Sequence, residues 1–224
     1  MGDEPLMESF IEVFIKYLPY YLPAAWLTLV VSLLGILIGL VLGLLTAFLR
    51  ISENRLIQLP ARIYIYLIRG TPLLLQILFI YFGLRGLLQL EAFTSAIIAL
   101  GVHNGAYLAE IFRGSIQSID RGQMEAARSL GMTYPRAMIR IILPQALRRS
   151  LPPLGNQFII ALKDSSLASA ITINELLLKA QQLAAANYLY MEMLTIAALF
   201  YLAYTTLFTL LVNRWEKRLS TDAA

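Results

Sequence analysis

The sequence predicts an all-α membrane protein with five transmembrane helices and one structured cytosolic loop. Of its 224 residues, 58% are hydrophobic and only 14% are charged, whereas roughly a quarter of a soluble domain is charged. The hydrophobic residues gather in runs long enough to cross a hydrocarbon core of about 30 Å. The chain contains no cysteine, which excludes disulfides, thiolate metal sites and cysteine nucleophiles.

Residues 1–23 form an acidic and then aromatic N-terminal segment in which Pro19 and Pro23 interrupt the chain. Its acidic residues have the wrong sign for a cleavable signal peptide. Apolar side chains recur at helical spacing, at Phe10, Val13 and Tyr17. We therefore expect a short helix lying in the membrane interface, with a frayed tail as the alternative.

The first predicted span, Trp26–Leu49, carries a small residue at every fourth position, at Gly35, Gly39 and Gly43. Residues four apart share one helix face, and small residues allow a second helix to approach closely. We interpret this face as a packing surface and not as a binding site.

The second predicted span, Leu59–Phe82, is interrupted near its middle. Pro72 removes a helical hydrogen bond and Gly70 loosens the turn. A carbonyl freed there cannot face lipid, so it must meet protein or line a wet cavity. Arg69 beside the break also needs a partner or water. It either snorkels or pairs with an acid to hold helices together, or it contacts a transported solute.

The remaining spans also contain polar groups. The third, Phe93–Phe112, carries a stripe of polar residues at spacings of three and four. The fourth, Leu154–Thr172, contains four consecutive polar residues. These residues neutralise one another, pair with Arg69 or line a pathway. A polar outer segment, helical over about Asn174–Ala186, leads to the fifth span, Met191–Val212. The polar residues are His103, Asn104, Tyr107 and Glu110; Lys163, Asp164, Ser165 and Ser166; and Glu192 in the fifth span.

The basic residues predict the orientation. With the N-terminus outside, thirteen lysines and arginines fall on the cytosolic side and three on the outer side, which satisfies the positive-inside rule. Five spans then place the C-terminus in the cytoplasm. The positive charge therefore reflects membrane topology, and no nucleic-acid partner is expected.

The polar segment Arg113–Arg149 contains seven arginines and predicts two short helices joined at Gly131. The first helix covers Gln123–Leu130, and the second is capped by Thr133 with Pro135 in its first turn. Such an ordered loop is expected to bind a partner protein. The alternative is a basic loop that only anchors to anionic lipid headgroups.

Several motifs resemble permease subunits of binding-protein-dependent ABC importers, in particular the polar amino acid branch. The resemblance covers nearly the whole chain after about residue 17 and implies a type I ABC importer permease-like fold. It implies an extracytoplasmic or interfacial segment at 1–23, a transmembrane permease domain at 24–215 with a coupling loop at about 114–150, and a cytosolic tail at 216–224. The motifs are Glu125-Ala126-Ala127 with Gly131 and Leu143-Pro144, Arg69-Gly70-Thr71-Pro72, Ala109-Glu110-Ile111-Phe112-Arg113-Gly114, the stretch ILPQALRRSLPPL, and Leu162-Lys163-Asp164-Ser165-Ser166-Leu167.

This resemblance implies a transport subunit of the prokaryotic inner membrane that performs no covalent chemistry. The sequence has no G-x-x-x-x-G-K-[ST] phosphate loop, so no cofactor is expected here, and ATP and Mg²⁺ would bind a partner. The implied partners are two ABC ATPase subunits, a second permease subunit that is identical or closely related, and an extracytoplasmic amino-acid-binding protein.

The candidate site residues form two groups. Three acids near the pathway favour a cationic amino acid, although Arg69 and Lys163 weaken that inference. The ATPase-coupling group is Glu125, Ala126, Ala127, Arg128, Gly131, Leu143 and Pro144. The substrate-pathway group is Arg69, Thr71, Gln76, His103, Asn104, Tyr107, Glu110, Lys163, Asp164, Ser165, Ser166 and Glu192.

Two other functions compete with this interpretation. A secondary carrier or channel would use intramembrane charges and a Pro-Gly break equally well, but it would not need the ordered loop. An intramembrane hydrolase could use Ser165 or Ser166 with Asp164 and His103, although the sequence has no nucleophile-elbow motif and a single histidine.

Overall fold

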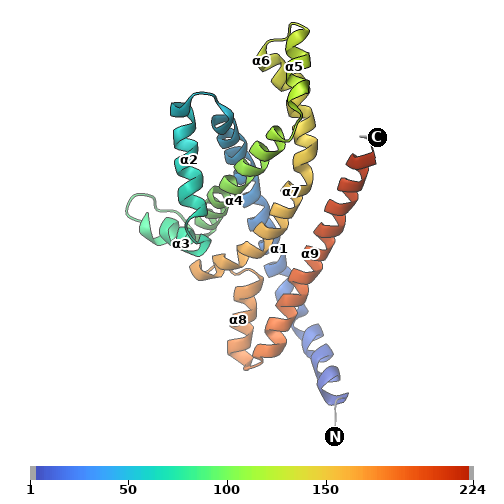
Figure 1. Cartoon of the computed structure of the whole chain (residues 1–224). Coiled ribbons are helices and arrows are strands. Elements are labelled where there is room, and N and C mark those ends of the chain that lie inside the picture. The colour runs from blue at the N-terminus through green and yellow to red at the C-terminus, as the bar shows by residue number, and fades with distance from the viewer. Residues whose placement is uncertain (1–3, 222–224) are drawn as a thin grey trace.

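The computed structural model describes residues 4–221 and, within them, the side chains of residues 10–217. Residues 1–3 of the predicted N-terminal segment and 222–224 of the predicted tail lie outside the described part. That part is helical, with no strand. In Figure 1, the four helices α1, α4, α7 and α9 run along the long axis, with α5 and α6 at one end and α8 at the other.

The first helix, α1 (Glu4–Ile51), is continuous over 48 residues and contains both Pro19 and Pro23. The expected short helix that ends at the prolines is therefore wrong. An internal proline costs a helix about 3 kcal/mol, but the first half of α1 packs against α8 and α9 through Tyr17 and Tyr21. Tertiary packing therefore offsets the local penalty.

The glycine face of α1 packs against α4 (Ala92–Gln117). A Cβ atom added to Gly43 would lie 2.7 Å from the Leu108 Cβ, and one added to Gly35 would lie 2.8 Å from the Leu100 Cβ. No side chain fits at these positions without displacing the neighbouring helix. The predicted packing face is confirmed, and it sets the depth at which α4 lies in the protein.

The predicted interruption of the second span is also confirmed. Helix α2 (Arg55–Arg69) ends at the break, and α3 (Leu73–Leu78) with the π-helical turn η1 (Phe79–Gly83) continues beyond it. The two parts meet at an angle of 105°. Asn54 caps α2 by accepting a hydrogen bond from the backbone N–H of Leu56 at 2.9 Å.

Three further α-helices follow the polar loop among residues 143–221. Helix α7 (Leu143–Asp164) begins eleven residues before the predicted span and includes Pro152 and Pro153. A 3₁₀ segment, η3 (Ser165–Ile171), leads to α8 (Leu176–Asn187), which matches the predicted outer helix within two residues. Helix α9 (Tyr190–Thr221) extends beyond the predicted fifth span in both directions.

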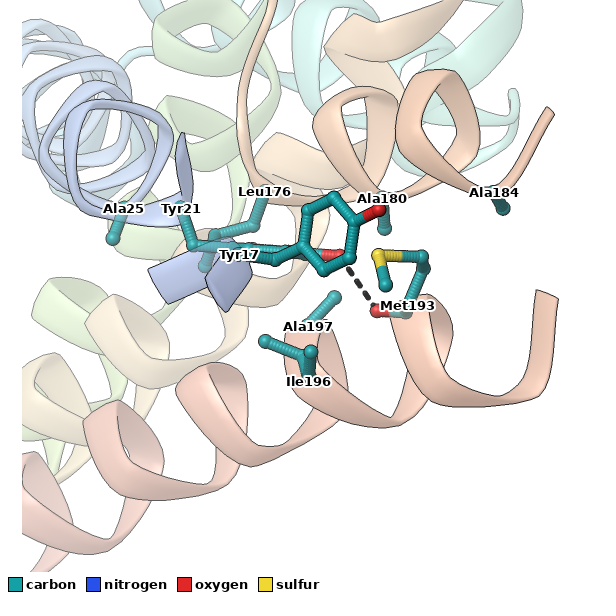
Figure 2. Packing of buried hydrophobic residues seen from close by; sticks show 9 residues of the cluster. All are labelled: Tyr17, Tyr21, Ala25, Leu176, Ala180, Ala184, Met193, Ile196 and Ala197. Carbon is teal, nitrogen blue, oxygen red and sulfur yellow. Dashed lines mark hydrogen bonds between the residues drawn. The ribbon is translucent and has the colours of Figure 1, made fainter. Parts of the chain in front are cut away.

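A buried cluster joins the first half of α1 to α8 and α9 (Figure 2). At its centre, the Tyr21 hydroxyl donates to the Met193 carbonyl oxygen at 2.7 Å, and the Tyr21 ring stacks on Phe200 with centroids 5.8 Å apart. We call this the Tyr21 cluster. Its members are Tyr17, Tyr21, Ala25, Leu176, Ala180, Ala184, Met193, Ile196 and Ala197.

Within the described residues, three helices are long and apolar enough to cross a membrane: Phe10–Ile51, Ala92–Gln117 and Tyr190–Lys217. The bent pair Arg55–Arg69 and Leu73–Gly83 makes a fourth if the pair counts as one span. Helix α7 is not among them, because its mean hydropathy is reduced by polar residues along its length. The count of five spans stays a prediction.

Candidate functional site

The break between α2 and α3 is bridged by the Gln76 side chain. Pro72 has no N–H to give to the Ile68 carbonyl oxygen, and Gln76 Nε2 lies 2.8 Å from that oxygen instead. The same nitrogen lies 3.1 Å from the Thr71 carbonyl oxygen and 2.9 Å from Thr71 Oγ1. The freed carbonyl is therefore met by protein, which the membrane environment requires.

His103 extends this bonded group to α4. Its Nδ1 lies 3.1 Å from Gln76 Oε1, and its ring centroid lies 5.1 Å from that of Tyr107. Both His103 and Gln76 are buried, whereas Thr71 is exposed. Three predicted pathway residues, Thr71, Gln76 and His103, are thus brought together, and their hydrogen bonds hold the bend between α2 and α3 against α4.

A group of charged residues lies towards the end of α4 that leads to α5. The Arg113 guanidinium bonds Glu110 Oε2 at 2.6 Å, and Arg50 Nε lies 3.6 Å from Glu110 Oε1. These are the two ion pairs found among residues 10–217. Arg69 is not ion-paired there; its guanidinium lies over the Tyr107 ring, 5.0 Å from the centroid.

An open cavity of about 600 Å³ lies beside this group, between α2 and α4. Three arginines and two tyrosines line it, and no acidic side chain is among its lining residues. Arginines on one helix face cannot be exposed to hydrocarbon without a large energetic cost, so this face adjoins water or another protein. The lining residues are Arg50, Arg62, Ile65, Tyr66, Arg69, Gly70 and Tyr107.

Asn104 lies in a different environment. It is fully buried between α4 and α7, where its Oδ1 accepts a hydrogen bond from Gln157 Nε2 at 2.8 Å. Its Nδ2 donates to the Leu100 carbonyl oxygen at 2.8 Å. In this conformation, one hydrogen bond joins the two amides inside the contact between α4 and α7.

The polar turn at the end of α7 faces α9. Lys163 and Ser166 line a cavity of about 430 Å³ together with Tyr201 and Thr205 of α9. Ser165 is buried, and its hydroxyl donates to the Leu162 carbonyl oxygen at 2.7 Å. The predicted pathway residues thus line at least two separate cavities within one chain.

The alternative pairings of this turn can be compared with the structure. No ion pair joins Asp164 to Arg69 in the part of the chain with described side chains. The Ser165 hydroxyl donates to the Leu162 carbonyl oxygen of α7, and His103 Nδ1 contacts Gln76. These contacts give no support to a serine–histidine triad. Glu192, the remaining predicted pathway residue, is half-buried in the first turn of α9, at the end near α8.

The polar loop folds into a projecting knob, which we define as α5 (Arg121–Ser129), α6 (Tyr134–Ala137) and the π-helical turn η2 (Met138–Ile142) with their connections (Figure 1). Asp120 caps α5 by accepting from the Gly122 N–H at 2.7 Å. Gly131 has a φ of 80°, a conformation that favours glycine. The predicted helix–Gly–helix loop is observed, although α6 is one turn long and Thr133 makes no side-chain cap.

The coupling residues differ in exposure. Ala127 is buried within the knob, whereas Glu125, Ala126, Arg128 and Pro144 are exposed and Leu143 is half-buried. Leu130, which was not among the predicted coupling residues, is 85% exposed at the connection between the two helices. A leucine directly before the glycine of a polar loop is a local sequence signal that could have identified it.

Other residues of the site were missed for different reasons. Arg50 and Arg62 entered only the count of cytosolic charges, yet both line the cavity between α2 and α4. Gln157 is a polar residue inside a predicted span, which is the same signal that identified Asn104. Its contact with Asn104 depends on how α7 packs against α4, which the sequence does not show.

The fold and these features define the class of protein: a multi-helix membrane subunit with polar groups at its helix contacts and a projecting helical knob. The chain belongs to the family described as "Binding-protein-dependent transport system inner membrane component", whose model matches residues 35–221. Members of this family are permease subunits of ABC importers, which work with ATPase and binding-protein partners. The chain is accordingly a multi-pass protein of the bacterial inner membrane.

Two curated relatives and two solved structures illustrate the similarity. The glutamine transport system permease protein GlnP of Escherichia coli (strain K12) is 40% identical over 178 residues, which cover 78% of this chain and 81% of the relative. The L-cystine transport system permease protein TcyB of Bacillus subtilis (strain 168) is 41% identical over 186 residues, covering 80% of this chain and 78% of the relative.

A crystal structure of an amino acid ABC transporter with histidines matches with a TM-score of 0.88 at 42% identity, covering 92% of this chain and 97% of the other. The MetNI methionine ABC transporter in an inward-facing conformation matches with a TM-score of 0.75 at 18% identity, covering 98% of this chain and 99% of the other. The second similarity concerns the fold alone.

Proposed function

We propose that this chain is the permease subunit of an ATP-driven importer of polar amino acids, coupled to a separate ATPase through the knob. The relatives at about 40% identity include permeases named for glutamine and cystine transport, which supports an amino acid as the solute. ATP and Mg²⁺ would bind the ATPase, because the sequence has no phosphate loop of its own.

The observation that carries the coupling role is the surface of the knob. Leu130 exposes a large apolar side chain, and Glu125, Ala126 and Arg128 are exposed on the preceding helix. An apolar side chain with charged neighbours is consistent with the apolar centre and polar rim of a protein–protein contact. A loop that only bound anionic headgroups would need its arginines and not this exposed leucine. The knob therefore supports an ATP-driven importer over a carrier that works alone.

The family and the uncovered arginine face support the proposed assembly. Arg62 and Arg69 lie on α2 beside an open cavity, so a second permease subunit or a water-filled pathway should cover them. We propose two permease subunits, identical or closely related, with two ATPase subunits at the knobs and an extracytoplasmic amino-acid-binding protein. The N-terminus would lie outside, and the C-terminus in the cytoplasm.

The transport pathway would use the polar residues of α2, α4, α7 and α9 by alternating access. Glu110 is already paired with Arg113 and Arg50, which removes one of three acids that favoured a basic amino acid. We therefore propose polar amino acids as the solute class, of which basic ones are members. Normal uptake by both Arg69→Gln and Lys163→Gln, whose side chains line the two cavities, would contradict this pathway.

The test is reconstitution with the ATPase and binding protein in proteoliposomes. Glu125→Lys should reduce uptake by roughly tenfold or more, because it reverses a charge at the proposed contact, and substrate should no longer stimulate ATP hydrolysis. Glu216→Lys, an equal charge change on the exposed end of α9, should leave uptake and stimulation unchanged. Unchanged coupling in Glu125→Lys would overturn the role of the knob.

A further inference from the structure

The segment that follows α7 and begins with the two serines of the polar turn is wound in an unusual way. The 3₁₀ helix η3 continues for seven residues, whereas 3₁₀ runs longer than about four residues are uncommon. It ends at Thr172, which has a φ of 66° and a ψ of 19°. This left-handed conformation is sterically disfavoured for a β-branched residue. Two departures from relaxed geometry therefore occur next to each other.

Side-chain packing explains the tight winding. Ser165, Ala168 and Ile171 are the buried residues of η3, and a 3₁₀ helix places every third residue directly in line. Ala168 and Ile171 pack into a cluster with Leu73 and Ile77 of α3, together with residues of α1 and α4. In an α-helix, the same three positions would rotate progressively out of line. The winding is thus set by the neighbours in this conformation.

The far side of η3 is firmly anchored by Glu175, the residue that precedes α8. Its buried carboxylate accepts hydrogen bonds from the N–H groups of Leu177 and Leu178, each at 2.9 Å, and from the Tyr201 hydroxyl at 2.7 Å. Burial raises the pKa of the Glu175 carboxyl, and these three donors oppose that shift. The Leu176 N–H also donates to Thr28 Oγ1 of α1 at 3.2 Å.

The start of α8 is therefore bonded to both α1 and α9, and the Tyr21 cluster packs along the rest of it. On the other side of η3, α7 is continuous from Leu143, directly after the knob, to Asp164. The strained segment Ser165–Thr172 thus lies between α7 with the knob and the body formed by α8, the first half of α1 and the first half of α9.

We propose that Ser165–Thr172 is the hinge at which α7 and the knob rotate relative to the body anchored by Glu175 during transport. The proposal rests on the proposed function, because it assumes a cycle driven through the knob. When the knob moves, α7 transmits the movement, and the anchored start of α8 cannot follow. The 3₁₀ segment rewinds, and Thr172 leaves the left-handed region. Glu175 acts as a positioning residue that keeps the far side of the hinge in place.

The chain offers a matched control for the strain. Among residues 4–221, Thr172 and Tyr188 are the two non-glycine residues with positive φ, and Tyr188 ends α8 inside the anchored body. Glycine at either position relieves a similar steric penalty. Both variants should raise the unfolding temperature. Only Thr172→Gly should favour the present conformation over the one in which the 3₁₀ segment is rewound, by roughly fivefold or more. It should slow ATP-dependent uptake by a similar factor.

The movement itself can be measured because the chain has no native cysteine. Spin labels on Leu147→Cys and Gln181→Cys, at exposed positions of α7 and α8, span the hinge. Labels on Gln181→Cys and Leu194→Cys, at exposed positions of α8 and α9, stay within the anchored body. Labelled subunits are diluted with unlabelled ones in the complete transporter, and distances are recorded with and without ATP and vanadate.

The expected result is a nucleotide-dependent shift in the distance across the hinge and a constant distance within the body. Normal uptake with an invariant distance across the hinge would overturn the hinge alone. So would an equal slowing of uptake by Tyr188→Gly and Thr172→Gly. If the unmodified complex shows no ATP-dependent uptake, the proposed function fails and the hinge with it.

Discussion

At one end of the molecule, buried polar side chains hold helices together, and at the other end, exposed side chains form the proposed contact with a partner. At the α8 end, polar groups are buried and bonded within the chain: the Tyr21 hydroxyl bonds Met193, and the Glu175 carboxylate has three donors. At the knob, Leu130 and Glu125 are exposed. A buried and satisfied group holds helices together, whereas the exposed side chains of the knob are available for the contact with another chain that we propose.

The largest expected effect is at the α8 end. Tyr21→Ala should destabilise the protein by about 3–5 kcal/mol, because it opens a cavity and leaves the Met193 carbonyl oxygen without its donor. Tyr20→Ala is the matched control, since its side chain is 55% exposed whereas that of Tyr21 is fully buried. Thermal unfolding in detergent measures both. Equal losses would show that the Tyr21 cluster does not hold this end together.

A smaller effect is expected at the contact between α1 and α4, which lies between the two ends. Gly43→Ala should cost about 1–3 kcal/mol, because the new Cβ would lie 2.7 Å from the Leu108 Cβ and 3.1 Å from the Gly105 carbonyl oxygen. Gly114→Ala meets nothing within 4 Å on the same pair of helices, so it should be neutral or slightly stabilising. The same unfolding assay compares them, and equal melting temperatures would contradict close packing here.

The smallest effect on stability is expected at the knob. Leu130→Ala should change the free energy of unfolding by less than about 0.5 kcal/mol, because the side chain is 85% exposed. The same variant should lose the ATPase subunit during purification in detergent. Leu202→Ala, an exposed leucine of α9, should retain it. Full retention of the ATPase by Leu130→Ala would remove the contrast between the two ends.

The predictions that succeeded from sequence concern local chemistry. Pro72 lacks an N–H in any fold, so a break near it and a need for a donor could be predicted, and Gln76 supplies that donor. Glycines at every fourth position share one face of any α-helix, so the packing face of α1 could also be predicted. The loop with Gly131 belongs to the same group, because its φ of 80° favours glycine.

The predictions that failed or stayed incomplete concern contacts between distant segments. Pro19 and Pro23 should end a helix by local rules, yet α1 passes through both because α8 and α9 pack against it. The partner of Asn104 is Gln157, 53 residues further along the chain. No local sequence pattern shows which of several amide side chains within the membrane will contact one another.

The sequence by itself determined that this is an all-helical membrane protein with a broken helix, a glycine packing face and an ordered polar loop. These properties follow from composition and from periodicity over a few residues. Only the tertiary structure decided which polar groups satisfy one another and where strain collects, as at Thr172 beside the Glu175 anchor. The reason is geometric: the partner of a buried group depends on the rotation and depth of a neighbouring helix, and these are set by packing of the whole chain.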